Sequence, residues 1–175
     1  VLNGQKNFVL DGHVADVVIV AARQPGTSGA EGIGLFVVDG TASGLQRRAL
    51  DAIDETRKLA ELSFNEVSAQ ALNDAGDAVA AITRTLDDGA IALANEMVGG
   101  AQALLDSVVE YAQIRMQFGR VIGSFQAVKH KCAEMLLDVE LAKSAAYYAA
   151  EARADNDPEV SALASLAKAT TSDAY

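Results

Sequence analysis

The sequence is poor in the residues that build metal sites and disulfide frameworks. Its 175 residues include one cysteine, Cys132, and two histidines. Neither a disulfide nor a zinc site of Cys and His ligands can be assembled from this set within one chain. We therefore expect no metal site, and we expect Cys132 to be a buried structural thiol.

Basic charge is also scarce. Lys and Arg total 14 against 24 Asp and Glu, which gives a net charge of -10. Such a balance disfavours binding to phosphate backbones and anionic lipid surfaces, so we expect neither a nucleic acid nor a membrane partner. No apolar run reaches the roughly 18 to 20 residues that span a bilayer, and the first residues lack the pattern of a secretory leader. The expected compartment is the cytoplasm.

The first part of the chain has the pattern of an antiparallel sheet or small barrel. Short runs of β-branched and aromatic residues alternate with turn-forming pairs such as Asp11-Gly12 and Asp39-Gly40. Asn3-Gly4 is a further turn signal and suggests that another strand precedes it. The predicted strands comprise residues 8–10, 17–20, 33–38 and 60–64.

From residues 73–76 onward the period becomes helical. One long helix is predicted from Asp77 or Asp87 to Phe118, and Ser124 is expected to cap a second, antiparallel helix. A third helix is expected to start at Asp157-Pro158-Glu159, with Asp157 as its cap. Two adjacent glycines, Gly99-Gly100, interrupt the first helix and are expected to allow close approach of another helix.

These patterns predict an α+β fold with two domains. An antiparallel β-domain is expected over residues 1–72, followed by an antiparallel helical bundle over residues 73–175. The sequence starts in a predicted strand and stops in a predicted helix. Both domains are therefore expected to be incomplete.

The most specific pattern lies between the first two predicted helices. Residues 111–120 read Tyr-Ala-Gln-Ile-Arg-Met-Gln-Phe-Gly-Arg, and residues 124–126 read Ser-Phe-Gln. This resembles the signature of the acyl-CoA dehydrogenases, in which a long helix ends in Arg-x-x-Phe-Gly and the next begins with Phe-Gln or His-Gln. Residues 2–16 resemble the family's Asn-Gly-x-Lys, aromatic and Ala-Asp segment, and Thr56-Arg57 also fits. The resemblance covers the whole chain in order.

The resemblance implies a FAD site at a contact between two subunits. Arg115 and Gln117 are expected to meet the pyrophosphate or adenosine part of the neighbour's FAD, since a guanidinium matches phosphate oxygens in a planar, bidentate way. The alternative is that Arg115 only caps the helix C-terminus. Gln126 is expected to donate a hydrogen bond to the cofactor. Packing against the cofactor is expected for Phe118, Ile122 and Phe125.

On the β side, the resemblance places Phe8 and Leu10 against the isoalloxazine ring. Leu10 stands where the family has a hydroxyl residue that hydrogen-bonds the flavin near N5, so only its backbone N–H could take that part. The alternative is that Phe8 and Leu10 are ordinary residues of the sheet core.

The reaction that the resemblance implies is the FAD-dependent dehydrogenation of an acyl-CoA to the trans-2-enoyl-CoA. Electrons would pass to an electron-transferring flavoprotein, and the protein would be a tetramer built as a pair of dimers. No catalytic residue is assigned in this chain, because the family's base lies beyond residue 175 or at the position of Gly89. Asp87 is a candidate contact to the substrate, although stabilisation of a helix N-terminus also explains it.

Two further functions stay open. Leu10, Gly89 and Ala90 depart from the family pattern, which is compatible with a non-catalytic partner subunit of a mixed oligomer. The remaining possibility is a helical interaction module with a β-domain attached, which would bind no flavin.

Overall fold

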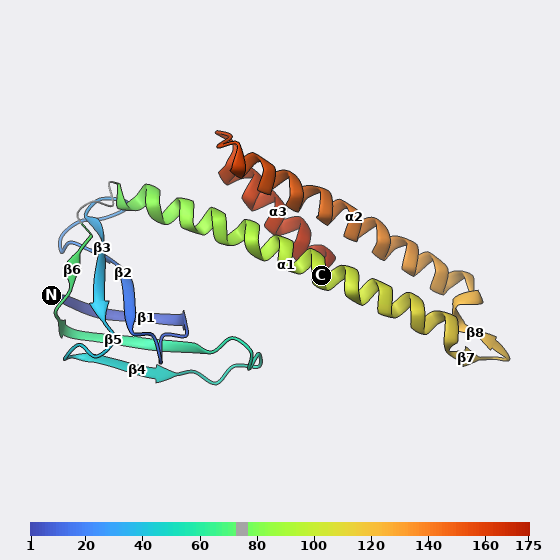
Figure 1. Ribbon diagram of the computed structural model, residues 1–175, viewed down its shortest axis with the longest axis horizontal. Helices are drawn as coiled ribbons and strands as arrows, with labels where there is room; N and C mark the ends of the chain where they lie inside the picture. The colour runs from blue at the N-terminus through green and yellow to red at the C-terminus, as the bar shows by residue number, and fades with distance from the viewer. Residues whose placement is uncertain (73–76) are drawn as a thin grey trace. The chain divides into compact units, whose positions relative to one another are not determined.

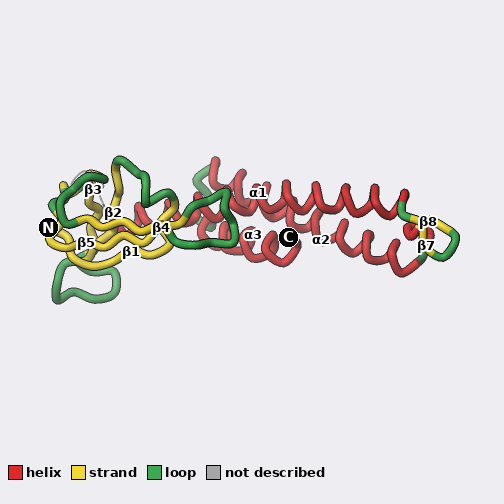
Figure 2. Tube along the Cα trace, turned by 90° about the horizontal axis from the view of Figure 1, so that it is seen from below, coloured by secondary structure: helices red, strands yellow, loops and turns green. Residues whose placement is uncertain are grey.

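The computed structural model describes residues 1–72 and 77–175. The predicted change of pattern at residues 73–76 lies outside the described residues. The chain forms two compact units, Val1–Ala81 and Ile82–Tyr175, and each is described by itself. The first unit holds two three-stranded sheets, and the second holds nearly all of the long helices (Figures 1 and 2).

One three-stranded sheet of the first unit has β5 in its centre. β5 (Leu59–Val67) pairs antiparallel with β1 (Leu2–Leu10) on one side and with β4 (Leu45–Ala49) on the other. β4 was not predicted, because its sequence contains no β-branched or aromatic residue. Arg48 of β4 and Glu61 of β5 lie side by side and form a salt bridge of 3.0 Å.

The second sheet is centred on β3. β3 (Ile33–Asp39) pairs antiparallel with β2 (Val17–Arg23) and with the short β6 (Gln70–Ala71). The prediction of antiparallel strands is thus confirmed, as two sheets. Residues of both sheets share one hydrophobic core, since alternate side chains of each strand point to the same face. The buried members of this core are Leu2, Val18, Val20, Val38, Leu62, Phe64 and Val67.

The turn predicted at Asn3-Gly4 is wrong. Both residues lie inside β1, where the pairing with β5 shifts register. The side-chain oxygen of Asn3 accepts a hydrogen bond from the backbone N–H of Glu66 at 2.8 Å. The Asn3-Gly4 pair therefore lies at a register shift within a strand and not in a turn.

Three long helices follow, as predicted, and all of them except the first turn of the first helix lie in the second unit. α1 (Ala78–Ile114) begins after Asp77, whose carboxylate accepts the backbone N–H of Val79 at 2.9 Å. α2 (Gln126–Ala154) and α3 (Val160–Ala174) complete the bundle. Within residues 1–72 and 77–175, no helix is long and apolar enough to cross a membrane.

α3 begins later than predicted. Asp157 accepts the backbone N–H of Glu159 at 2.7 Å, but Pro158 and Glu159 form a turn and the helix begins at Val160. Asp157 therefore organises the turn before the helix and is not its N-cap.

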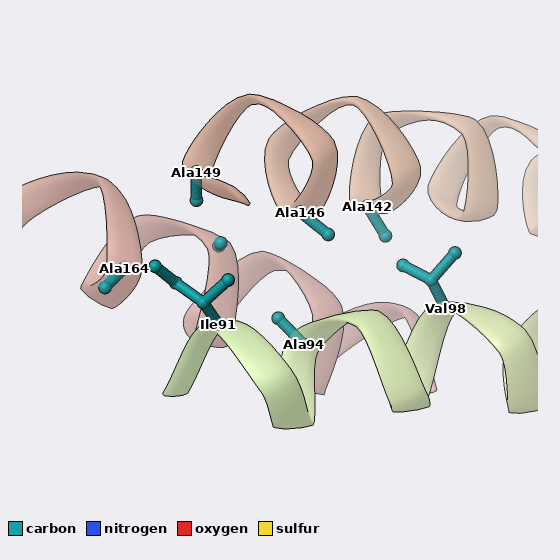
Figure 3. Packing of buried hydrophobic residues seen from close by; sticks show 8 residues of the cluster. Ile91, Ala94, Val98, Ala142, Ala146, Ala149 and Ala164 are labelled. Atoms are coloured by element: carbon teal, nitrogen blue, oxygen red, sulfur yellow. The ribbon is translucent and has the colours of Figure 1, made fainter. Parts of the chain in front are cut away.

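α1 and α2 run antiparallel, as expected. Ile91 near the start of α1 shares a core with Ala149 near the end of α2, whereas Leu105 packs in a cluster with Val139 of α2. Most side chains between the helices are alanines, which allow the backbones to approach closely (Figure 3). The main helical core consists of Ile91, Ala94, Val98, Ala142, Ala146, Ala149, Ala164 and Ala167.

The two adjacent glycines of α1 have different surroundings. A Cβ added at Gly99 would meet no atom within 4 Å, and one added at Gly100 would meet the ring of Tyr175 at 2.5 Å. Gly99 is exposed. The expectation of close packing is therefore wrong for Gly99, whereas at Gly100 the ring of Tyr175, the C-cap residue of α3, does approach closely.

Candidate functional site

The segment between α1 and α2 forms a compact hairpin, here called the interhelix hairpin (residues 115–125). α1 ends at Ile114, four residues before the predicted end at Phe118. The backbone N–H of Arg115 still donates to Tyr111, and its carbonyl accepts the N–H of Ile122 at 2.8 Å. Both the backbone N–H and the carbonyl of Arg115 are therefore hydrogen-bonded, at the point where α1 ends and the hairpin begins.

Two short strands form the arms of the hairpin. β7 (Met116–Gln117) pairs with β8 (Arg120–Val121), and Gln117 lies opposite Arg120. The two connecting residues both have positive φ, 53° at Phe118 and 79° at Gly119. This is the tight two-residue turn that matches the twist of paired strands. Gly119 adopts such a φ freely, whereas the side chain of Phe118 makes it unfavourable by about 1 kcal/mol or more.

A single 3-10 turn, η1 (Ile122–Ser124), connects the hairpin to α2. The Ser124 hydroxyl donates to the carbonyl of Val121 at 2.7 Å. Phe125 occupies the N-cap position of α2 and offers no side-chain hydrogen bond there. Ser124 is therefore not the cap that the sequence predicted, because the 3-10 turn directs its hydroxyl back to the hairpin.

The aromatic rings of the hairpin contact each other. The ring centroids of Phe118 and Phe125 are 6.1 Å apart at an interplanar angle of 89°, an edge-to-face pair. The guanidinium carbon of Arg120 lies 4.1 Å from the centroid of the Phe125 ring. Phe118 itself is 91% exposed, so its contact with Phe125 leaves almost all of its surface open.

The hairpin lies in a stretch of this acidic chain that has basic but no acidic residues. No acidic residue occurs between Glu110 and Glu134. No salt bridge to Arg115 or Arg120 is found among residues 1–72 and 77–175. Two unneutralised guanidinium groups next to exposed aromatic surface suit a ligand with both phosphate and aromatic groups.

The other residues predicted to contact the cofactor lie in the hairpin or at the start of α2. Arg115, Gln117 and Gln126 are exposed, whereas Ile122 and Phe125 are half-buried. The fold thus brings together all six residues predicted from this segment within one hairpin and the helix start after it. Their contacts with a cofactor stay a prediction.

Phe8 and Leu10 belong to the first unit, which is described apart from the hairpin. Lys6 pairs with Leu62 and Val9 with Ala60, so β1 contains one extra residue between these pairs. Phe8 lies in this bulge with φ 58°, and its side chain is 72% exposed. Leu10 is 58% exposed. The alternative that both are residues of the sheet core is therefore wrong.

Asp87 lies in the third turn of α1 and has a structural partner. Its carboxylate accepts a hydrogen bond from the Ser161 hydroxyl of α3. The neighbouring Asp88 forms a salt bridge with Arg153 of α2, and this hydrogen-bonded guanidinium lowers the pKa of Asp88. The two carboxylates therefore tie α1 to both other helices, and the substrate contact proposed for Asp87 stays a prediction.

Two contributors to the site were missed in the sequence. Arg120 lies over Phe125, and a Cβ added to Gly123 would come 2.8 Å from the carbonyl oxygen of Ala112. Arg120 and Gly123 both stand within the family motif, but the motif does not predict which atoms they contact. In the described part of the chain no cluster of His, Cys, Asp or Glu could hold a metal ion, and Cys132 is half-buried.

Comparison with protein families matches both parts of the chain. The family model for the acyl-CoA dehydrogenase middle domain matches residues 1–67, and that for the acyl-CoA dehydrogenase C-terminal domain matches residues 76–175. Together they account for nearly the whole sequence in the order expected from the motifs.

Individual relatives agree. The chain is 34% identical to the short-chain specific acyl-CoA dehydrogenase of Megasphaera elsdenii, over 98% of this chain and 46% of that protein. It is 30% identical to the caffeyl-CoA reductase–Etf complex subunit CarC of Acetobacterium woodii, over 95% of this chain and 45% of that protein. The chain thus spans about half the length of the curated relatives that it matches.

The solved structures show the same fold. The butyryl-CoA dehydrogenase of Megasphaera elsdenii superposes with a TM-score of 0.90 at 32% identity, covering 98% of this chain and 46% of that one. Sheets, interhelix hairpin and helices therefore follow a known arrangement, and the chain belongs to the acyl-CoA dehydrogenase family.

Proposed function

We propose that the protein containing this chain binds FAD and dehydrogenates an acyl-CoA thioester to the trans-2-enoyl-CoA. The observation that carries the proposal is the interhelix hairpin. It presents Phe118, 91% exposed and held at an unfavourable φ, three residues after Arg115, which has no salt-bridge partner among residues 1–72 and 77–175. Strained backbone conformations cluster at ligand sites, where contacts with the ligand offset the cost of the strain.

The residues present fit FAD. Arg115 and Gln117 would hold the pyrophosphate or adenosine part, because both are exposed donors and the guanidinium has no salt-bridge partner among the described residues. Phe118, Ile122 and Phe125 would supply apolar surface. Gln126, at the first position of α2, would donate a hydrogen bond.

The first unit would supply the surface for the isoalloxazine ring. Phe8 offers an exposed ring in a bulge, and Leu10 offers exposed apolar surface on the same strand. Bound FAD would serve as acceptor of the hydride from the substrate. The base that removes the α-proton has no candidate in this chain. Most family members have it at a position beyond residue 175, and some have it at the position that Gly89 occupies here.

The remaining parts of the proposal come from the family. Electrons would pass to an electron-transferring flavoprotein, which the name of the Acetobacterium woodii relative supports. The expected assembly is a homo- or hetero-tetramer, built as a pair of dimers with the hairpin at a subunit contact. Asp87 is proposed to lie near the substrate, and the cytoplasm is the proposed compartment.

A second function is supported by three positions. Gly89, Ala90 and Leu10 lack the side-chain groups that the family pattern places there. A Cβ at Gly89 would meet no atom within 4 Å, so the fold itself does not require glycine at this point. These residues favour a non-catalytic partner subunit that lends its hairpin to a neighbour's cofactor.

The visible absorbance spectrum of the full-length protein tests both functions. Purified wild type and Arg115→Ala are compared before and after addition of a panel of acyl-CoA thioesters. We expect flavin bands in the wild type and an affinity for FAD about 10- to 100-fold lower in the variant, the effect of losing a charged hydrogen bond. Lys168→Ala on α3 is the matched control, because it also removes one positive charge.

The outcomes separate the candidates. Flavin bands that bleach on addition of an acyl-CoA support the dehydrogenase. Bands that persist with every thioester support the partner subunit. A protein without flavin bands, even after incubation with FAD, refutes the dehydrogenase and points to a partner subunit without a cofactor of its own or to an interaction module.

A further inference from the structure

Three side chains of the interhelix hairpin form a continuous stack, here called the Arg120 stack (Arg120, Phe125 and Phe118). The guanidinium carbon of Arg120 lies 4.1 Å from the Phe125 centroid, over the ring. The ring of Phe118 meets that of Phe125 at 6.1 Å and 89°. The members come from β8, from the N-cap of α2 and from the hairpin turn.

The two arginines of the hairpin have different surroundings. Arg115 is anchored only through its backbone, and its exposed guanidinium contacts no aromatic ring in the described structure. The guanidinium of Arg120 is already engaged with the face of Phe125. A planar guanidinium stacks on a ring through both charge and surface, which the compact ammonium of a lysine cannot reproduce.

Phe118 needs such support because little else restrains it. It lies at the tip of the turn, it is 91% exposed, and its φ of 53° is unfavourable for a bulky residue. Among the described residues, Phe125 is the aromatic residue that Phe118 contacts. If Phe125 changes rotamer, Phe118 loses its contact with that ring. The rings of Phe118 and Phe125 then adopt several orientations, and ordering them on ligand binding costs conformational entropy.

We propose that Arg120 is a positioning residue that acts through Phe125, and that the stack holds the rings of Phe125 and Phe118 in the orientation that receives FAD. This inference rests on the proposed function. It assigns different parts to the two arginines: Arg115 meets the cofactor's phosphates, whereas Arg120 orders the aromatic surface without touching the cofactor.

A double-mutant cycle on the full-length protein tests the assignment. Apoprotein is titrated with FAD for the wild type, Arg120→Ala, Phe125→Leu and the double variant. We expect Arg120→Ala to weaken FAD binding about two- to five-fold, the effect of one cation–π contact at an exposed site. Because Arg120 acts through Phe125, the double variant should bind no more weakly than Phe125→Leu alone.

The conservative variant Arg120→Lys distinguishes stacking from charge. We expect it to bind FAD as weakly as Arg120→Ala, since lysine keeps the charge and loses the planar stack. If Arg120 instead contacts phosphate, Arg120→Lys restores most of the affinity and the effects of Arg120→Ala and Phe125→Leu multiply. Either of these results overturns the inference.

Fluorine NMR provides a measurement without cofactor. With para-fluorophenylalanine at position 125, the fluorine resonance should shift between the wild-type background and Arg120→Ala, and Lys168→Ala should leave it unchanged. An unchanged resonance in Arg120→Ala overturns the inference. A wild type that binds no FAD refutes the proposed function itself and with it the cofactor role of Arg120, whereas normal FAD binding in Arg120→Ala refutes only the role of the stack.

Discussion

Replacing Gly123 with alanine should destabilise the helical unit and disturb the site together. Gly123 lies in η1 and faces the last turns of α1. A Cβ at this position would come 2.8 Å from the Ala112 carbonyl oxygen and 3.2 Å from its carbonyl carbon, below the 3.4 Å at which ordinary contact begins. Both atoms belong to the backbone of a helix, so neither can move by a simple change of rotamer.

The magnitude follows from this contact. Overpacking of a tight site typically costs about 1 to 3 kcal/mol. The matched control is Gly99→Ala, where the added Cβ meets nothing within 4 Å. In that exposed helix position alanine should stabilise the protein by about 1 kcal/mol. The same chemical change should therefore alter the free energy of unfolding in opposite directions at the two glycines.

Urea denaturation followed by far-ultraviolet circular dichroism measures both changes. We also expect Gly123→Ala to lower the affinity for FAD, because η1 connects the hairpin to Phe125, whereas Gly99→Ala should leave FAD binding unchanged. A Gly123→Ala variant as stable as the wild type would refute the reasoning, since it would mean that η1 does not lie against α1 at this distance.

Three further changes have defined outcomes. Phe118→Asn should change the free energy of unfolding by less than about 1 kcal/mol, because relief of the unfavourable φ offsets the lost edge contact, yet it should weaken FAD binding in a titration. Asp88→Asn should lower stability at neutral pH. Since the hydrogen bond from Arg153 lowers the pKa of Asp88 below 3.8, its contribution is present above that pH and is lost as the pH falls through the lowered pKa. The difference between wild type and Asp88→Asn in urea titrations should therefore vanish in strong acid. Ala146→Leu should destabilise the helical unit by about 1 to 3 kcal/mol in the same assay, because Ala146 is fully buried between the helices.

Much of the fold could be predicted because the relevant signals are local. Runs such as Val17–Val20 are rich in β-branched residues and lie in β2, and the helical period after Asp77 gave α1. The strand β4 was missed because Leu45–Ala49 has no strand propensity, and its pairing with β5 supplies the hydrogen bonds that make it a strand.

Element ends were predicted less well. α1 was expected to reach Phe118 and ends at Ile114, because the two positive φ values at Phe118 and Gly119 start a hairpin turn. Ser124 had the side chain of a helix cap, but its hydroxyl bonds to Val121 instead. In both cases the backbone path of the hairpin overrides a preference that each residue would show alone.

The sequence by itself determined the order of β-domain and helices and the family, because strand propensity, helical period and the motif around Arg115 depend on neighbours along the chain. Only the tertiary structure decided that Arg120 lies over Phe125, that Gly123 meets the backbone at Ala112, and that Phe8 is exposed in a bulge. These facts are distances and exposures set by how elements pack and pair, and no residue's own preference specifies them.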